Sequence, residues 1–258
     1  EISYYKHLKL TKIADKKHRK LESEVFKNAD ITLATSYTDA ENFRKKGANA
    51  FCITNGFDVD ASTTLSMTEE NSKTLPLSNS TTKFTLSYIG VLEQLRNPEI
   101  LWETLNDLVQ ENADFKNDFQ LKFVGRLDDK ILQKIESSAL KNNLTNLGYQ
   151  THDVALKHMQ DSTVLLITNF PQESSKGIIP GKIFEYLATG KTILSFGPKD
   201  ADVEKILNET KAGKHFGYDE KENLKKFILE SYENWKSGTL NQNAENIEQF
   251  SRKNLTQK

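Results

Sequence analysis

The chain has 258 residues, of which 36% are hydrophobic and 28% charged, and its net charge at pH 7 is −1. That length suffices for one large domain or two modest ones, and the near-neutral charge gives no indication of a nucleic-acid partner. The single cysteine, Cys52, excludes an intramolecular disulfide and a cysteine metal cluster. Because no apolar run approaches about 18 residues, the sequence predicts no transmembrane helix.

The first 58 residues predict two helices and two short strands. Apolar residues recur on one face over 4–28, which indicates a helix, and strands are expected over 30–36 and 50–54, with a helix over 37–46 between them. Residues 1–20 carry a net charge of +5. Two interpretations of this basic helix stay open: contact with an anionic membrane surface, or a solvated helix face.

Residues 59–83 are rich in Ser, Thr, Asn and Lys and predict a linker. From residue 84 onward, short apolar runs alternate with helical patterns. Strands are expected over 84–89, 119–124, 144–147, 163–168, 192–196 and 213–216. Helices are expected over 97–112, 128–141, 152–160, 200–208, 220–235 and 243–258. This alternation predicts an α/β fold with a Rossmann-like, doubly wound parallel sheet, in which ligands bind beyond the carboxyl ends of the strands.

The most informative stretch covers residues 177–191 and has the sequence GIIPGKIFEYLATGK. It follows a buried-strand pattern and begins a further helix near Gly181. The first amides of a helix have no partner within it and attract anions, and Lys182 adds a positive charge beside them. Glu185 lies one turn further, where a carboxylate can accept hydrogen bonds from vicinal sugar hydroxyls. An ordinary loop and amphipathic helix is the alternative that this pattern alone leaves open.

At these residues the chain resembles the C-terminal, donor-binding half of retaining GT-B glycosyltransferases of the family 4 type. The form of the motif is similar to that of enzymes of bacterial surface-polysaccharide synthesis. The resemblance implies that Glu185 binds the ribose of a nucleotide sugar. The family often has a second glutamate eight residues earlier, where this chain has Gly177. Residues 22–36 and the Asn55–Asp58 segment match the order in which the family's first domain ends.

The resemblance also implies where a nucleotide sugar is held. A glycine and two cations grip the donor diphosphate, and here the cations are Arg96, one position before the usual lysine, and Lys182. A surface arginine is the alternative for Arg96, and a partly buried tyrosine is the alternative for the base-side residue Tyr149. The expected donor-binding residues are Gly90, Arg96, Tyr149, Ile179, Pro180, Gly181, Lys182 and Glu185.

No cofactor and no metal are expected. His152, His158 and His215 have no metal-ligand spacing and no serine or cysteine partner in a nucleophile pattern, so they are interpreted as core or surface histidines. The chain contains neither G-x-G-x-x-G nor a P-loop. The catalytic residues are left unassigned.

On this resemblance the chain is expected to comprise four segments: residues 1–58 as the end of an acceptor-side domain, 59–83 as a linker, 84–240 as the nucleotide-sugar domain, and 241–258 as a helix packing back toward the first segment. Its expected function is transfer of a hexose, with retention, from a UDP- or GDP-sugar to a glycan or lipid-linked acceptor. The expected location is cytoplasmic, with peripheral contact at the inner face of the membrane. The absent start of the first domain predicts a fragment with weak turnover. A nucleotide-sugar-binding module without turnover is the alternative.

Overall fold

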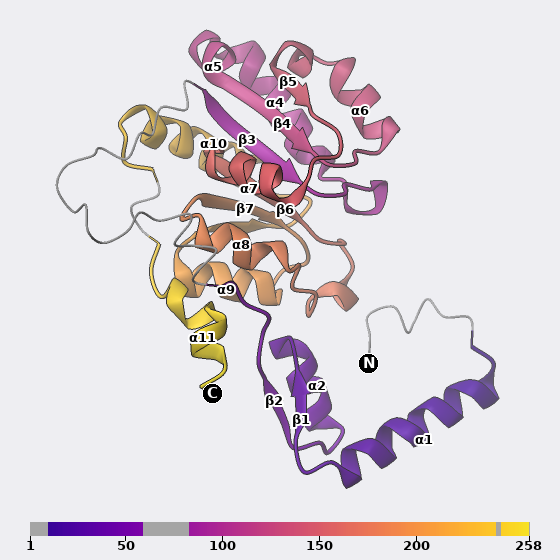
Figure 1. Cartoon of the computed structure of the whole chain (residues 1–258). Coiled ribbons are helices and arrows are strands. Elements are labelled where there is room, and N and C mark those ends of the chain that lie inside the picture. Colours follow the sequence, from indigo (N-terminus) through magenta and orange to yellow (C-terminus); the bar gives the residue numbers. More distant parts are fainter. Residues whose placement is uncertain (1–9, 59–82, 241–243, 258) are drawn as a thin grey trace, which may run out of the picture.

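A six-stranded parallel sheet forms the centre of the molecule (Figure 1). The computed structural model describes residues 10–58, 83–240 and 244–257. The strands run in the order β5-β4-β3-β6-β7-β8. Their bounds are β3 (Phe84–Ile89), β4 (Phe119–Val124), β5 (Leu144–Asn146), β6 (Val164–Thr168), β7 (Thr192–Phe196) and β8 (Gly213–Phe216). The predicted doubly wound parallel sheet is therefore confirmed.

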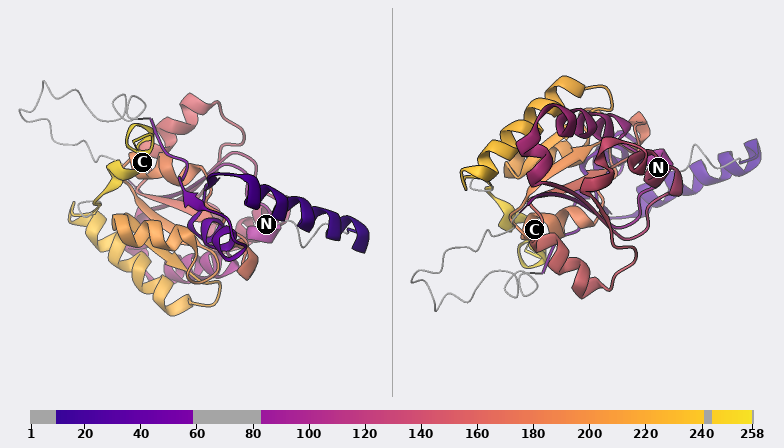
Figure 2. Two further views of the ribbon diagram at one scale, coloured as in Figure 1. Left: turned by 90° about the horizontal axis from the view of Figure 1, so that it is seen from below. Right: turned by 90° about the horizontal axis from the view of Figure 1, so that it is seen from above.

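Helices cover both faces of this sheet (Figures 1 and 2). Their bounds are α4 (Glu99–Glu111), α5 (Ala113–Asp118), α6 (Asp129–Glu136), α7 (His152–Gln160), α8 (Lys182–Ala188), α9 (Asp202–Thr210) and α10 (Lys221–Lys236). Successive strand side chains point to opposite faces. In β3, Phe84, Leu86 and Tyr88 belong to the core under α4, α6 and α10, whereas Ile89 belongs to the core under α7, α8 and α9. The two cores hold the sheet as the middle of three layers.

The chain order reverses at β3, and in doubly wound sheets such a reversal marks the crevice beyond the strand ends. The chain passes from β3 to β4 and β5 on one side, and then returns to place β6 on the other side of β3. In doubly wound sheets, ligands bind beyond the carboxyl ends of the two strands at such a switch point. The segments that follow Ile89 and Thr168 therefore border the expected site.

An aromatic cluster packs the amino-terminal end of the sheet. The rings of Phe115 and Phe119 stack at 4.9 Å, and Tyr232 meets Phe115 edge to face at 5.1 Å. Phe84 contacts all three of these rings. Each such pair contributes about 0.5–1.5 kcal/mol beyond the area it buries. The strands are thus anchored at the edge opposite the switch-point crevice.

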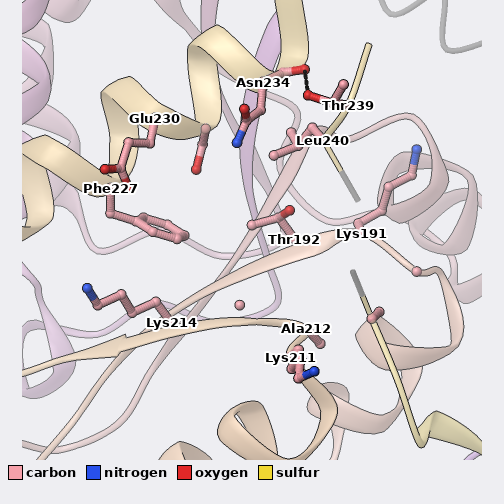
Figure 3. Close-up of a pocket in the computed structure, with 14 residues that line it drawn as sticks. Lys191, Thr192, Lys211, Ala212, Lys214, Phe227, Glu230, Asn234, Thr239 and Leu240 are labelled. Atoms are coloured by element: carbon pink, nitrogen blue, oxygen red, sulfur yellow. Dashed lines mark hydrogen bonds between the residues drawn. The ribbon is translucent and has the colours of Figure 1, made fainter. Parts of the chain in front are cut away.

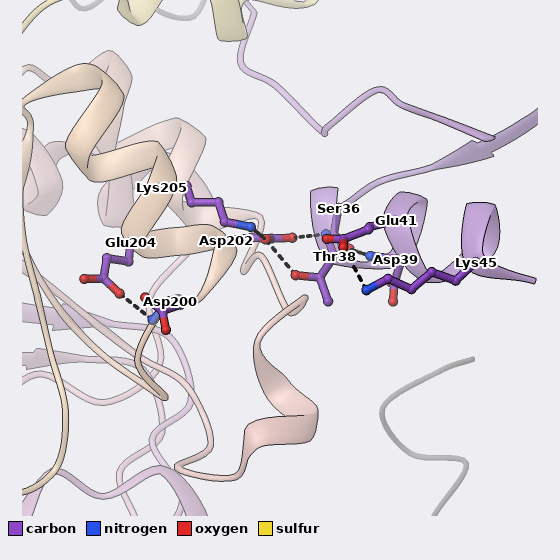
Figure 4. Close-up of polar contacts among 9 residues, drawn as sticks. All are labelled: Ser36, Thr38, Asp39, Glu41, Lys45, Asp200, Asp202, Glu204 and Lys205. Carbon is purple, nitrogen blue, oxygen red and sulfur yellow. Dashed lines mark hydrogen bonds and ion pairs between the residues drawn. The ribbon is translucent and has the colours of Figure 1, made fainter.

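A small N-terminal unit lies beside the main domain. It contains α1 (Lys12–Asn28), β1 (Thr32–Ala34), α2 (Tyr37–Lys45) and β2 (Ala50–Cys52), and its two strands pair in parallel. The unit contacts the main domain through Asp202 at the start of α9 (Figure 4). The buried Asp202 carboxylate accepts hydrogen bonds of 2.8 Å from both the amide and the hydroxyl of Thr38, at the start of α2.

The C-terminal residues return to the same side of the molecule. The 3-10 turn η6 (Ile247–Phe250) and the short helix α11 (Arg252–Leu255) follow residue 244. The Phe57 amide donates to the Phe250 carbonyl, and the Arg252 amide donates to the Phe57 carbonyl. Gly56 is required here, since a Cβ atom at this position would lie 2.3 Å from the Phe250 oxygen. The end of the N-terminal unit and the end of the chain are therefore joined.

Several expected boundaries were wrong. The helix expected over 128–141 ends at Glu136, where the hydroxyls of Ser137 and Ser138 bond backward to helix carbonyls and a 3-10 turn, η4 (Ala139–Asn143), follows. The helix α5, capped by the Asn112 side chain, was missed. The single C-terminal helix expected over 243–258 is instead η6 and α11. Residues 4–9 of the first helix and residues 59–82 of the linker lie outside the described residues.

The basic N-terminal helix projects away from the main domain (Figure 1). Within it, Ile13, Leu21 and Val25 are largely exposed, while Phe26 packs against the rest of the N-terminal unit. No helix among the described residues is long and apolar enough to span a bilayer. Whether α1 meets an anionic surface stays a prediction.

Candidate functional site

Three glycines form the carboxyl edge of the sheet around the switch point. Gly90, Gly125 and Gly148 follow β3, β4 and β5, and each has a positive φ. The Gly90 amide donates to the Val124 carbonyl, and the Gly125 amide donates to the Gly148 carbonyl, both at 2.7 Å. A Cβ atom on Gly125 would lie 2.2 Å from the Gly90 oxygen. The edge is therefore built from bare backbone, which lets a ligand approach closely.

Lys182 reaches from the start of α8 across the crevice to β3. Its Nζ donates a hydrogen bond of 2.6 Å to the Ile89 carbonyl and lies 4.1 Å from the centre of the Tyr88 ring. A Cβ atom on Gly90 would lie 3.0 Å from this nitrogen. Burial lowers the pKa of the Lys182 ammonium to about 7, and the nearby Arg96 guanidinium acts in the same direction, against a smaller opposite effect of Glu185.

Arg96 approaches the crevice from the 3-10 turn η3 (Gln94–Arg96), which follows β3. Its Nη2 donates to the Val91 carbonyl at 3.1 Å and pairs with Glu93 at 3.3 Å. Its guanidinium lies 5.5 Å from the centre of the Phe170 ring. The Arg96 Nε is buried without a hydrogen-bond partner among the described residues. The two cations that the sequence proposed are therefore brought together, from segments 86 positions apart.

The loop between β6 and α8 is fastened by its own side chains. Asn169 donates from its amide to the Ile178 carbonyl at 2.7 Å, and Ser175 donates to the carbonyls of Phe170 and Gln172. Ile179 packs against the core beside α8, and Gly181 is exposed. These bonds give the 169–181 loop a defined shape over the crevice.

The first turn of α8 is tighter than expected. The Ile183 amide donates to the Pro180 carbonyl and the Phe184 amide donates to the Gly181 carbonyl. The expectation that the first amides of this helix lack internal partners is therefore wrong for these two residues. The start of α8 therefore offers fewer free amides to an anion than the sequence predicted.

Glu185 and Tyr149 lie at the same edge but are less constrained. Glu185 is partly exposed in the first turn of α8, one turn beyond the loop. Tyr149 follows Gly148 and is 88% exposed, so its ring is free to stack on a flat partner. The partly buried alternative for Tyr149 is wrong. The donor-binding roles of both residues stay predictions.

Sequence reasoning missed three aromatic side chains around the cations. Tyr88 donates its hydroxyl to the Val91 carbonyl at 2.9 Å, beside Arg96. Tyr218, just after β8, donates to the Asn169 carbonyl, and burial raises its pKa. Phe170 supplies the ring near Arg96. A signal was present only for Phe170, which lies in the polar loop that follows β6.

One of the three histidines has a serine partner that the sequence did not reveal. Ser195 Oγ lies 2.9 Å from His215 Nδ1, and His215 Nε2 lies 3.1 Å from the Pro198 carbonyl. The carbonyl can only accept, so Nε2 carries the proton and Nδ1 accepts from Ser195. Ser195 is completely buried, so the pair fixes the loop after β7. Among the described residues, no group of three or more His, Cys, Asp or Glu side chains could hold a metal ion.

A separate pocket of about 230 Å³ lies at the opposite edge of the sheet (Figure 3). It is bordered by the amino ends of β7 and β8 and by α10, and its basic lining residues are Lys191, Lys211 and Lys214. Its volume falls below the range of about 300–1,000 Å³ usual for small-molecule sites. None of the expected donor-binding residues lines it, so this pocket is distinct from the switch-point crevice.

The fold agrees with that of several solved structures. HepE of Anabaena, solved with UDP, has a TM-score of 0.69 at 19% identity, over 93% of this chain and 65% of its own. S. aureus TarM, solved with fondaparinux, alpha-GlcNAc-glycerol and UDP, has a TM-score of 0.62 at 15% identity, over 96% of this chain and 47% of its own. WaaG, a glycosyltransferase involved in lipopolysaccharide biosynthesis, has a TM-score of 0.57 at 13% identity, over 86% of this chain and 61% of its own.

The chain has the fold of a GT-B C-terminal half. At these identities the likeness establishes the fold alone, and the chain spans less than two thirds of the length of HepE, TarM or WaaG. No protein-family model and no curated protein sequence matches it. In GT-B terms, the sheet from β3 to β8 with its flanking helices matches the Rossmann-like domain.

Proposed function

We propose that the chain is the donor-binding part of a retaining glycosyltransferase that moves a hexose from a UDP- or GDP-sugar to a glycan or lipid-linked acceptor in polysaccharide synthesis. One observation carries this proposal. Lys182 and Arg96 converge on the glycine edge at the switch point, from opposite sides of the crevice between β3 and β6. A pair of cations beside bare backbone is suited to an anionic diphosphate.

In this proposal the residues of the chain bind and orient the donor. Lys182 and Arg96 hold the diphosphate, which becomes the leaving group, and stabilise the charge that develops on it as the sugar departs. Glu185 accepts hydrogen bonds from the ribose hydroxyls. Tyr149 stacks against the base, and the backbone at Ile179, Pro180 and Gly181 lines the loop. The mechanism requires no metal ion, because these cations supply the positive charge.

The solved neighbours are consistent with this substrate class. HepE is described with UDP and with UDP and glucose, and TarM with UDP and an oligosaccharide. A nucleotide sugar and a glycan acceptor are proposed for the present chain by analogy. A cytoplasmic location, with α1 resting on an anionic membrane surface, belongs to the same proposal.

A binding module without turnover is the second candidate, and a release assay distinguishes the two. In the enzyme proposal, positioning the acceptor against the donor can lower the barrier by about 7–11 kcal/mol, and the described residues hold only a small acceptor-side unit. We therefore expect the chain alone to bind UDP-glucose or a GDP-hexose but to release nucleoside diphosphate slowly.

The assay couples nucleoside diphosphate release to a detectable reaction, with and without oligosaccharide acceptors. Rates within the ordinary enzyme range of about 1–1,000 s⁻¹ would contradict the expectation of weak turnover and place the acceptor site within this chain. Acceptor-dependent release that is slow but lost in Lys182→Met would support the enzyme proposal. Binding with no release above background under any condition would favour the module.

A further inference from the structure

Lys182 lies at the switch point, and it forms no ion pair with a carboxylate of residues 10–58, 83–240 or 244–257. Its Nζ contacts a carbonyl oxygen and the face of a ring, at Ile89 and Tyr88, and both are neutral groups. None of the ion pairs within the described ranges includes Lys182, whereas Arg96 pairs with Glu93. A charged group taken out of water is costly unless it is paired. Within the described residues, the Lys182 ammonium therefore has no carboxylate in direct contact with it.

The groups facing Lys182 from each neighbouring element do not supply that charge. From η3 comes the Arg96 guanidinium, which repels the ammonium, and from α8 comes Glu185, which attracts it but forms no ion pair with it. The phenols of Tyr88 in β3, Tyr186 in α8 and Tyr218 after β8 all have pKa values raised by burial, so they are neutral at physiological pH. Glu93 is engaged by Arg96, so Glu185 is the one carboxylate named here that acts on Lys182, and it does so without forming an ion pair.

We propose that a nucleoside diphosphate entering this crevice brings a proton onto Lys182, so that donor binding is coupled to proton uptake. The step is a simple protonation: the neutral amine of Lys182 takes one proton from the solvent and becomes the ammonium that pairs with the diphosphate. The inference rests on the proposed function, because it describes what the bound donor does to that site. In this proposal Lys182 is not a permanent cation, because its charge depends on whether a diphosphate is bound.

The burial of Lys182 makes this coupling measurable near neutral pH. Its pKa in the free protein is lowered to about 7, and a diphosphate within hydrogen-bond distance raises it again, because a nearby opposite charge favours the charged form. Between the free and the bound pKa values, the complex holds more protons than the free protein does. The affinity for a diphosphate must therefore fall as the pH rises above 7, by up to about tenfold per pH unit for one proton.

The test is titration calorimetry with UDP between pH 7 and 9, in two buffers that differ in their ionisation enthalpy. Working above pH 7 avoids the terminal phosphate of UDP, because such phosphates titrate near about pH 6. For the native chain we expect a net uptake approaching one proton per UDP, and a Kd that rises with pH. For Lys182→Met we expect weaker binding with no proton uptake over this range.

Lys191→Met is the matched control. Lys191 is also a partly buried lysine whose pKa is lowered by burial, but it lies at the amino edge of β7, far from the crevice. This variant should keep both the proton uptake and the pH slope of the native chain. Because Lys182→Met can disturb packing, its near-ultraviolet circular dichroism is compared with that of the native chain, and the native proton count stands as a measurement independent of any variant.

Each outcome decides the inference. UDP binding to the native chain without proton uptake above pH 7 would overturn it while leaving the proposed function intact. Equal proton uptake by the native chain and by Lys182→Met would also overturn it, because another group would then be titrating. Absence of binding by both UDP and GDP at any pH would overturn the proposed function and this inference with it.

Discussion

At the scale of single residues, the site is defined by two cations of unequal environment. Arg96 has a carboxylate partner in Glu93 and a carbonyl acceptor in Val91. In the described part of the chain, Lys182 contacts the Ile89 carbonyl and the Tyr88 ring and forms no ion pair. An arginine keeps its charge in any environment, whereas a buried lysine readily changes its charge. Arg96 therefore keeps its positive charge, whereas the charge of Lys182 changes with its surroundings.

Lys182→Met should change how the free protein's stability depends on pH. The Lys182 pKa is about 7 in the folded chain and about 10.4 in an unfolded one. Between these values the unfolded chain binds more protons, so the free energy of unfolding of the native chain rises with pH. The cost of burying the ammonium is fully present below pH 7 and diminishes above it. The stability of the variant relative to the native chain should therefore fall from pH 7 to 10, by at most about 1.4 kcal/mol per pH unit.

Urea unfolding at several pH values provides this measurement. Lys199, which is exposed near the end of β7, gives the matched control Lys199→Met. The free energy of unfolding of this variant should differ from that of the native chain by the same amount at every pH. A stability difference for Lys182→Met that is equally constant with pH would contradict the environment assigned to Lys182.

Sequence reasoning found part of this site and missed the remainder for a physical reason. Lys182 and Glu185 lie on one short stretch with a recognisable pattern, and Arg96 follows a strand and a glycine. Tyr88 and Tyr218 lie in or after strands that are distant in the sequence, and only the packed sheet brings them together. A sequence pattern indicates contacts between residues that are close in the chain. It could not predict that Tyr88 of β3 and Tyr218 after β8 lie on the same side of the site.

At the scale of elements, the turns after the strands determine the shape of the edge. Gly125 has a φ of +121° and its backbone touches that of Gly90. Gly148 has a φ of +62°, and no heavy atom lies within 4 Å of where its Cβ atom would be. A side chain at Gly125 would therefore meet both an unfavourable φ and a backbone clash, whereas a side chain at Gly148 would meet only the unfavourable φ.

Gly125→Ala should destabilise the chain far more than Gly148→Ala. The first change adds a methyl group 2.2 Å from the Gly90 oxygen and imposes a φ that L-residues rarely adopt, which together should cost more than about 3 kcal/mol. The second adds only left-handed strain, about 1–2 kcal/mol. Chemical denaturation of both variants measures the difference. Similar losses for the two would show that the close approach at Gly125 does not exist in solution.

A second contact between elements joins the N-terminal unit to α9. The carboxylate of Asp202 is completely buried and accepts two hydrogen bonds from Thr38, while Lys205 pairs with it at 3.1 Å (Figure 4). Gly177 in the 169–181 loop also approaches Thr38. The N-terminal unit thus touches both α9 and the loop that borders the crevice.

Asp202→Ala should loosen this contact. Hydrogen bonds to a charged acceptor contribute about 1.5–3 kcal/mol, so we expect a loss of that size in urea unfolding, together with faster proteolysis within residues 10–58. Lys205→Ala is the control: its side chain is 45% exposed, and exposed ion pairs contribute about 0–1 kcal/mol. If Asp202→Ala unfolds like Lys205→Ala, the Thr38 contact does not hold the unit in place.

The element order was predicted more accurately than the element ends. The six strands of the sheet were predicted because apolar runs between glycine-bearing turns are strong signals, and β8 matches its expected bounds. The helix expected over 128–141 was divided because Ser137 and Ser138 compete for its last carbonyls. The sequence pattern gives little sign of this competition for the helix carbonyls, so it did not predict where the helix ends.

At the scale of the whole molecule, the six-stranded sheet and its helices lie beside the small N-terminal unit (Figures 1 and 2). The C-terminal residues return to Phe57 and close the connection between the two parts. The sheet, the loops and both cations belong to residues 83–240. Donor binding should therefore need only this part of the chain, whereas efficient transfer also needs an acceptor surface.

Calorimetric titration of UDP into the native chain and into Glu185→Ala tests the central claim most directly. If the crevice holds a nucleotide, the native chain binds UDP, and loss of the ribose contact weakens binding by roughly ten- to one-hundred-fold. Glu222→Ala, which changes an exposed glutamate on α10, should bind like the native chain. The account predicts this ordering of affinities. UDP affinity that is the same in the native chain and in Glu185→Ala, or no binding of UDP or GDP to the native chain, would contradict it.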